Sequence, residues 1–155
     1  MPAIKIENLT KRYRDVIAVD RLSLSINEGE LFSLLGVNGA GKTTTIKMLS
    51  CIAQPSEGDA YLLGKSIRKQ STEVKSLISV SPQETAVAPN LSVMENLRLM
   101  CGIHGFSKEK TREKLAELCE RFNLGEVLNR RAGKLSGGWQ RRLSIAMALI
   151  SQPKV

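Results

Sequence analysis

The segment that most constrains the fold runs from Leu31 to Thr44, LFSLLGVNGAGKTT. Its first five residues are nearly all apolar, a pattern typical of a strand buried on both faces, as in a parallel sheet under helices. A glycine-rich turn follows, and after it Met48, Leu49 and Ile52 recur at helical spacing. This strand–loop–helix order predicts an α/β fold.

The turn itself fits the pattern G-x-x-x-x-G-K-[ST] at every fixed position. Glycines let successive amide N–H groups turn inward, and the helix that follows adds partial positive charge, so the segment favours an anion. We expect Lys42 to reach the β- and γ-phosphates of a nucleoside triphosphate, Thr43 to bind Mg²⁺ and Thr44 to contact the α-phosphate. The alternative is a glycine-rich turn with no function. The candidate binding residues are Gly36, Asn38, Gly39, Ala40, Gly41, Lys42, Thr43 and Thr44.

Strand patterns dominate the first half of the chain and helical patterns the second. Strand patterns predict short strands at 4–7, 16–19, 22–26 and 60–63, with a turn at Gly29 after the third of them. A second buried strand is expected in LISVSPQ. Short helical periodicity is seen at 73–77. Ser92 with Glu95 three residues later has capping-box spacing, a second long helix begins at Ser107, and a last helix is expected from about Gly138 to Ser151, returning to the core.

Three motifs in one order carry a family resemblance: GVNGAGKTT, then SVSPQET with Gln83, then LSGGWQRR. The chain resembles the ATP-binding cassette (ABC) ATPases over its whole length. The resemblance implies a P-loop nucleotide-hydrolase core with a partial parallel sheet and a helical subdomain, and it implies ATP and Mg²⁺ as ligands. The implied division is an ATP-binding core at 1–87, a helical subdomain at 88–135, and the signature motif with its return helix at 136–155.

The resemblance also implies roles outside the phosphate loop. Gln83 would bind Mg²⁺ or the attacking water, although a solvated loop glutamine is the plain alternative. Ser136, Gly137 and Gly138 would form the signature motif, which binds the γ-phosphate of ATP held by a partner subunit; otherwise they are an ordinary helix start. Tyr13 would stack on adenine, or else pack at a strand edge.

The family's magnesium-supporting aspartate, its catalytic glutamate and its switch histidine follow later than these motifs. The resemblance therefore implies that the 155 residues hold no catalytic residue of their own, that they are an N-terminal fragment of an ABC ATPase, and that hydrolysis by this chain alone is near background. His104 lies in the helical part and does not match the switch histidine.

Charge and composition bear on partners. The net charge is +8, which suggests an anionic partner or a solvated basic face. Aromatic residues make up 4% of the chain, which argues against single-strand binding by base stacking, and no nucleic acid is expected.

The sequence around the motifs resembles the exporter branch, which serves drugs, antibiotics and polysaccharides. It implies a membrane permease partner, a second ATPase subunit in a head-to-tail dimer, and a cytoplasmic place at the inner face of the cell membrane. The alternatives are a soluble ABC ATPase acting on ribosomes or DNA, and a non-catalytic nucleotide-binding remnant.

Overall fold

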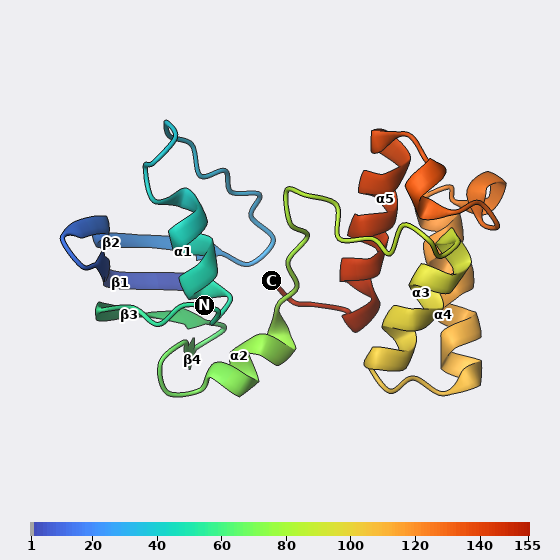
Figure 1. Cartoon of the computed structure of the whole chain (residues 1–155). Coiled ribbons are helices and arrows are strands. Elements are labelled where there is room, and N and C mark those ends of the chain that lie inside the picture. Colours follow the sequence, from blue (N-terminus) through green and yellow to red (C-terminus); the bar gives the residue numbers. More distant parts are fainter. Residues whose placement is uncertain (1) are drawn as a thin grey trace. The chain divides into compact units, whose positions relative to one another are not determined.

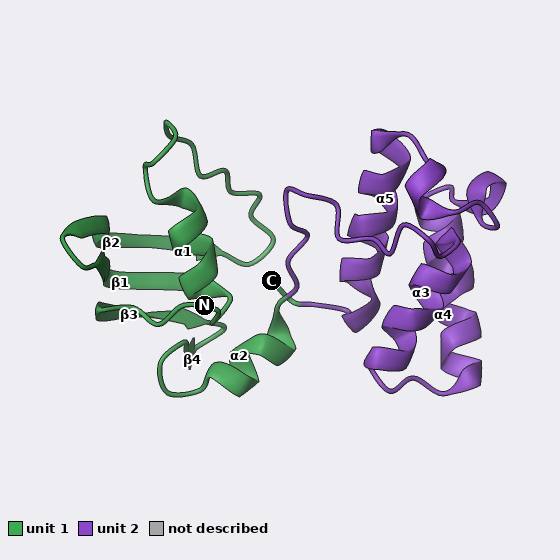
Figure 2. Cartoon of the chain, viewed as in Figure 1, with its two compact units in different colours: residues 1–78, 154–155 green, residues 79–153 purple. Residues whose placement is uncertain are grey.

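The computed structural model describes residues 2–155, which form two compact units (Figures 1 and 2). The first unit contains the residues up to Ile78 together with Lys154 and Val155, and the second runs from Ser79 to Pro153. No helix among residues 2–155 is long and apolar enough to cross a bilayer. The two units are described separately below.

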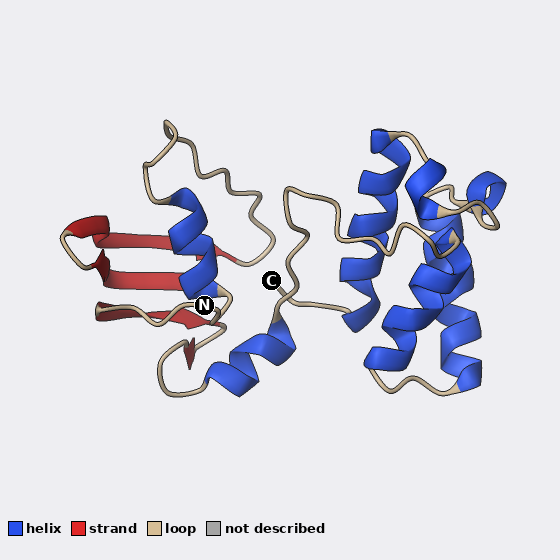
Figure 3. Ribbon diagram, in the orientation of Figure 1, coloured by secondary structure: helices blue, strands red, loops and turns tan. Residues whose placement is uncertain are grey.

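The first unit is built on a four-stranded antiparallel sheet in the order β2-β1-β3-β4 (strands labelled in Figure 1 and red in Figure 3). Its strands are β1 (Pro2–Tyr13), β2 (Val16–Asn27), β3 (Glu57–Leu62) and β4 (Lys65–Ser66). The strands predicted at 16–19 and 22–26 are one continuous strand, β2, which pairs with β1 through a tight turn between Tyr13 and Val16. The alternating pattern therefore predicts the strands correctly but divides β2 in two.

Two helices belong to this unit, α1 (Lys42–Leu49) and α2 (Ser71–Leu77). Met48 of α1 and Val74 of α2 are fully buried and pack in one cluster with Leu9 and Leu62 of the sheet. The apolar face of α1 thus covers one face of the sheet, which fixes the helix and the glycine-rich loop before it. Lys154 and Val155 join the unit through backbone N–H bonds to the Leu77 carbonyl.

The two buried strands predicted at Leu31–Leu35 and in LISVSPQ are not formed. Leu31 is 98% exposed and Leu35 is 88% exposed, and residues 31–35 and 78–81 have no strand pairing. A strand that is apolar on both faces needs neighbouring strands and covering helices, and residues 2–155 supply neither for these segments. The parallel part of the predicted sheet is therefore wrong for the described chain, because every strand pair in it is antiparallel.

The second unit is helical. It contains α3 (Val93–Ile103), α4 (Lys108–Arg121), α5 (Gly137–Ala148) and the short 3₁₀ turns η1 (Gly125–Val127), η2 (Ala132–Lys134) and η3 (Leu149–Ser151). The predicted capping box at the start of α3 is confirmed: the Glu95 amide donates to the Ser92 hydroxyl, and the Ser92 amide donates to the Glu95 carboxylate at 2.7 Å. The Ser92 hydroxyl also donates to the Glu95 carboxylate, at 2.8 Å, and the two bonds from the Ser92 amide and hydroxyl lower the pKa of the Glu95 carboxyl.

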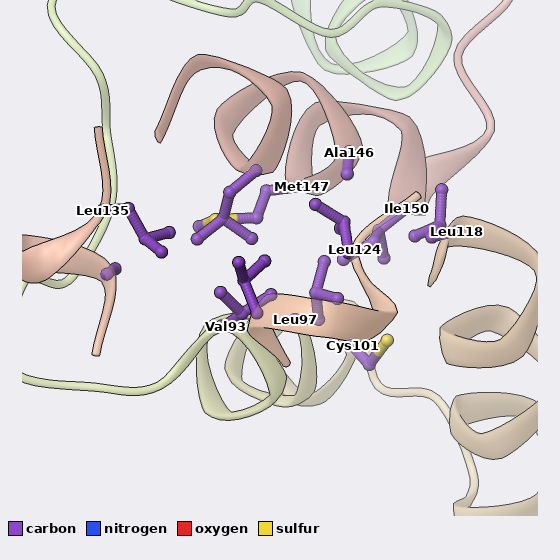
Figure 4. Close-up of a cluster of buried hydrophobic side chains, with 12 residues drawn as sticks. Val93, Leu97, Cys101, Leu118, Leu124, Leu135, Ala146, Met147 and Ile150 are labelled. Carbon is purple, nitrogen blue, oxygen red and sulfur yellow. The ribbon is translucent and has the colours of Figure 1, made fainter. Parts of the chain in front are cut away.

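The core of this unit combines all three long helices (Figure 4). Leu97 of α3, Leu118 of α4 and Leu143 of α5 are buried in one cluster. The sequence predicts that the last helix, α5, returns to the ATP-binding core, but its buried side chains pack against α3 and α4. The tertiary partner of an amphipathic helix cannot be read from its own periodicity, because the pattern only says that one face is buried.

Removing the cap of α3 provides a stability test. Ser92→Ala is expected to lower the free energy of unfolding of the helical unit by about 1 kcal/mol, because an orphan amide loses its acceptor. Urea denaturation followed by circular dichroism measures the change, and Ser92→Thr, which keeps a capping hydroxyl, is expected to stay close to the parent chain. Equal loss in both variants would contradict a capping role.

Candidate nucleotide-binding site

The predicted phosphate loop lies in the first unit, between the exposed segment 31–35 and α1. Gly39 and Gly41 have φ of +88° and +83°, the left-handed region that glycine adopts freely. A Cβ added at Gly41 would come within 2.2 Å of the Ala18 carbonyl oxygen of β2. The loop therefore rests directly on the sheet, and only glycine fits at this point of contact.

Lys42 is the first residue of α1, and its ammonium turns back over the loop. The Nζ atom donates to the Gly36 carbonyl at 2.6 Å and to the Val37 carbonyl at 2.8 Å. An ammonium has three N–H donors, so one remains for another acceptor. The lysine thus places a positive charge at the mouth of the loop while it closes the loop on itself.

The first turn of α1 suits an anion. Its N-cap is Gly41, which has no side chain to accept a hydrogen bond from the first helical amides. Free N–H groups at a helix N-terminus favour phosphate, and the helix dipole adds to that preference. The donor set of this loop therefore fits the phosphates of a nucleotide.

The threonines of the same turn divide into two kinds. The Thr45 side chain is buried, and its hydroxyl donates to the Gly41 carbonyl at 3.0 Å, so this hydroxyl bonds within the first turn of the helix. Thr43 is exposed and Thr44 is half-buried. An exposed hydroxyl beside a phosphate-binding loop fits Mg²⁺, which prefers hard oxygen ligands and keeps several waters.

Tyr13 lies at the end of β1, paired with Val16 across the β1–β2 turn. It is 47% exposed, and the Lys11 ammonium lies 4.9 Å from the centre of its ring. The paired Val16 is two residues from Ala18, whose carbonyl meets the loop at Gly41. Tyr13 and the phosphate loop therefore belong to the same end of the same sheet.

The other candidates lie in the second unit. Gln83 is exposed in the loop that precedes α3, and Ser136, Gly137 and Gly138 are exposed at the start of α5. Ser136 is the N-cap of α5, but its side chain makes no capping hydrogen bond. The start of this helix thus has the open amides that a second anion site requires.

Sequence reasoning missed the contribution of β2 to the phosphate loop. Ala18 and Val19 lie against Gly41, with the Val19 Cγ2 atom 3.0 Å from the position of an added Cβ. In the sequence these residues read as ordinary strand residues, and no local signal marks their contact with a loop more than twenty positions away. Only the packing of α1 on the sheet brings them together.

Comparison with known proteins decides the family. Residues 19–155 match the family described as ABC transporter, which is most of the chain. The chain belongs to the ABC transporter family. This match confirms the resemblance seen in the three motifs, and with it the P-loop type of fold.

The curated relatives that the chain matches are named as ATP-binding proteins of transport systems. It is 39% identical to a spermidine/putrescine import ATP-binding protein of Rubrobacter xylanophilus, with 99% of this chain and 40% of that protein covered. It is also 39% identical to a Nod factor export ATP-binding protein of Burkholderia orbicola, with 98% of this chain and 50% of that protein covered. The chain therefore spans about half the length of these ABC relatives, whose names include both import and export.

Solved ABC cassettes share the fold. The dimeric structure of a bacterial ABC transporter cassette, MJ0796, has a TM-score of 0.81 at 30% identity, with 97% of this chain and 70% of that chain covered. This likeness extends over both units, since it covers nearly the whole chain. It supports the ABC cassette fold for the described residues.

Proposed function

We propose that this chain is the ATP-binding part of the ATPase subunit of an ABC exporter, and that Mg²⁺ accompanies the ATP. The observation that carries the proposal is the loop Gly36–Thr43 with the Lys42 ammonium folded over it. Gly36, Asn38, Gly39, Ala40, Gly41, Lys42 and Thr44 hold the phosphates, while Thr43 and Gln83 bind the metal. Tyr13 stacks on adenine, in keeping with its exposed ring at the same end of the sheet.

A second subunit completes the site in this proposal. Ser136, Gly137 and Gly138 present the open N-terminus of α5 to the γ-phosphate of ATP bound by the partner subunit. The similar MJ0796 cassette is dimeric in its solved structure, which supports a paired arrangement. ATP held between two chains makes the association depend on nucleotide, and ATP binding and hydrolysis can then drive transport.

A permease is the second proposed partner. The helical unit has a groove of about 640 Å³ between α3 and α4, lined by Met94, Phe106 and Leu115 and rimmed by Arg98 and Arg112. An apolar floor with a cationic rim suits an amphipathic segment of a membrane protein. The proposed location is accordingly cytoplasmic, at the inner face of the cell membrane. Export in preference to import rests on the resemblance to the exporter branch and on the Nod factor relative.

The proposal is tested by titrating the chain with ATP, ADP and AMP in Mg²⁺ buffer by calorimetry. Because Lys42 and the loop amides act on the β- and γ-phosphates, ATP and ADP are expected to bind at least about tenfold more tightly than AMP, a difference of about 1.4 kcal/mol. Equal affinity for all three, or no binding of any, would contradict the proposal. Salt-sensitive binding of RNA without nucleotide binding would favour a ribosome-directed ATPase instead.

A further inference from the structure

The ring of Tyr13 has a cation on one of its faces. The Lys11 ammonium, from the same strand β1, lies over this ring at 4.9 Å from its centre. An ammonium in this position is attracted by the electron-rich face of the ring. The ring is nevertheless 47% exposed, which leaves surface for a flat ligand. A cation thus covers part of the ring without closing it off.

A hydrogen bond fixes the position of the Lys11 ammonium. Its Nζ atom donates to the Gln54 carbonyl at 2.6 Å. Gln54 lies in the turn that follows α1, where the Ile52 and Ala53 amides donate at 2.9 and 3.0 Å to one acceptor. That acceptor is the carbonyl of Lys47, in the last turn of the helix. Lys11 therefore connects the ring to one end of α1, and the other end of the same helix begins at the phosphate loop.

The backbone on either side of Lys11 is also held. The Ser56 amide donates to the Thr10 carbonyl at 2.8 Å, and the Arg12 amide donates to the Ser56 hydroxyl at 3.0 Å. Lys11 is half-buried, whereas Arg12 is exposed and its guanidinium lies 3.3 Å from the Glu57 carboxylate. These two neighbouring cations thus have different partners, and Lys11 is the one that contacts the tyrosine ring.

We propose that Lys11 is a positioning residue, which holds the Tyr13 ring in the orientation that stacks on the base of ATP. This inference rests on the proposed function, in which Tyr13 stacks on adenine. A free tyrosine side chain loses conformational freedom when a base stacks on it, and a ring that a cation already holds loses less. Because Lys11 is bonded to the turn after α1, it also fixes the ring relative to the phosphate loop.

The first test measures the order of the Tyr13 ring without nucleotide. Lys11→Met removes the ammonium and keeps an apolar stem, so the order of the ring, measured by ¹³C relaxation, is expected to fall below that of the parent chain. The chain has two tyrosines, and Tyr61→Phe assigns the signals of Tyr13. Lys11→Arg keeps a cation that can lie over the ring and is expected to preserve its order. Arg12→Met is the matched control, since it removes the neighbouring cation, and it is expected to leave the ring ordered.

The second test separates the base of the nucleotide from its phosphates. In Mg²⁺ buffer, Lys11→Met is expected to weaken ATP binding about two- to fivefold, the range that one exposed cation–π contact supports. Binding of inorganic tripolyphosphate, which has no base, is expected to be unchanged. In a chain that carries Tyr13→Leu, Lys11→Met is expected to have no further effect on ATP binding, because the ring that it holds is absent. Arg12→Met is expected to leave both affinities within about twofold of the parent values.

Three results would overturn the inference. The first is an equal loss of affinity for ATP and tripolyphosphate in Lys11→Met, because the lysine would then act on the phosphates. The second is an equal loss with and without the Tyr13 ring, and the third is a ring that stays as ordered in Lys11→Met as in the parent chain. Failure of the parent chain to bind ATP would instead contradict the proposed function, and the ring measurement, which needs no nucleotide, would still decide whether Lys11 holds the ring.

Discussion

Replacing Lys42 with methionine is expected to weaken ATP binding by about two orders of magnitude. Lys42 is the one cationic residue of the segment 36–44. Its ammonium lies over the phosphate loop and donates to the Gly36 and Val37 carbonyls. Hydrogen bonds to charged groups contribute about 1.5–3 kcal/mol each, and about 1.4 kcal/mol corresponds to a tenfold change in affinity. Methionine keeps most of the length of the side chain and loses the charge.

Calorimetric titration with Mg-ATP measures this loss. Lys47→Met is the matched control, because Lys47 is an exposed lysine in the last turn of the same helix and is expected to leave ATP affinity within about twofold. An unchanged affinity in Lys42→Met would refute the phosphate-binding role.

Replacing Gly41 with alanine is expected to destabilise the first unit by about 3 kcal/mol or more. The new Cβ would lie 2.2 Å from the Ala18 carbonyl oxygen, and backbone atoms cannot move aside as a flexible side chain can. The residue would also have to adopt φ near +83°, which costs about 1 kcal/mol for a non-glycine residue. The loop and α1 would have to move away from β2.

Gly39→Ala separates the two costs. Gly39 also has a positive φ, +88°, but an added Cβ meets no atom within 4 Å. Alanine there is expected to cost only the backbone strain of about 1 kcal/mol. Thermal unfolding of both variants, followed by circular dichroism, is the measurement. Equal destabilisation at Gly39 and Gly41 would show that contact with Ala18 does not hold the loop on the sheet.

The sequence was sufficient to predict the features that depend only on residues close together in the chain. The capping box at Ser92 needs only two side chains three residues apart, and both of its bonds are present. The start of α1 at Lys42 follows from the glycines before it and the helical periodicity after it. The family too was evident from short motifs in one order, and the match over residues 19–155 bears it out.

The strands at 31–35 and 78–81 were predicted wrongly for a physical reason. An apolar run states that a segment avoids water, but a strand exists only when a neighbour satisfies its backbone N–H and C=O groups. Residues 2–155 provide no such neighbour, and Leu31, Phe32 and Leu35 are left exposed. The apolar pattern of one segment does not tell whether a neighbouring strand is available to pair with it.

The same distinction between local pattern and tertiary contact applies to the candidate site. The sequence by itself determined which residues can bind phosphate. Three features favour an anion there: the flexible backbone of the glycines, the N-terminus of a helix, and a lysine at a fixed position between them. Only the tertiary structure decided that Gly41 rests on the carbonyl of Ala18, and that the Lys11 ammonium is bonded to the carbonyl of Gln54. These contacts join residues more than twenty positions apart, and their existence depends on which buried faces pack together.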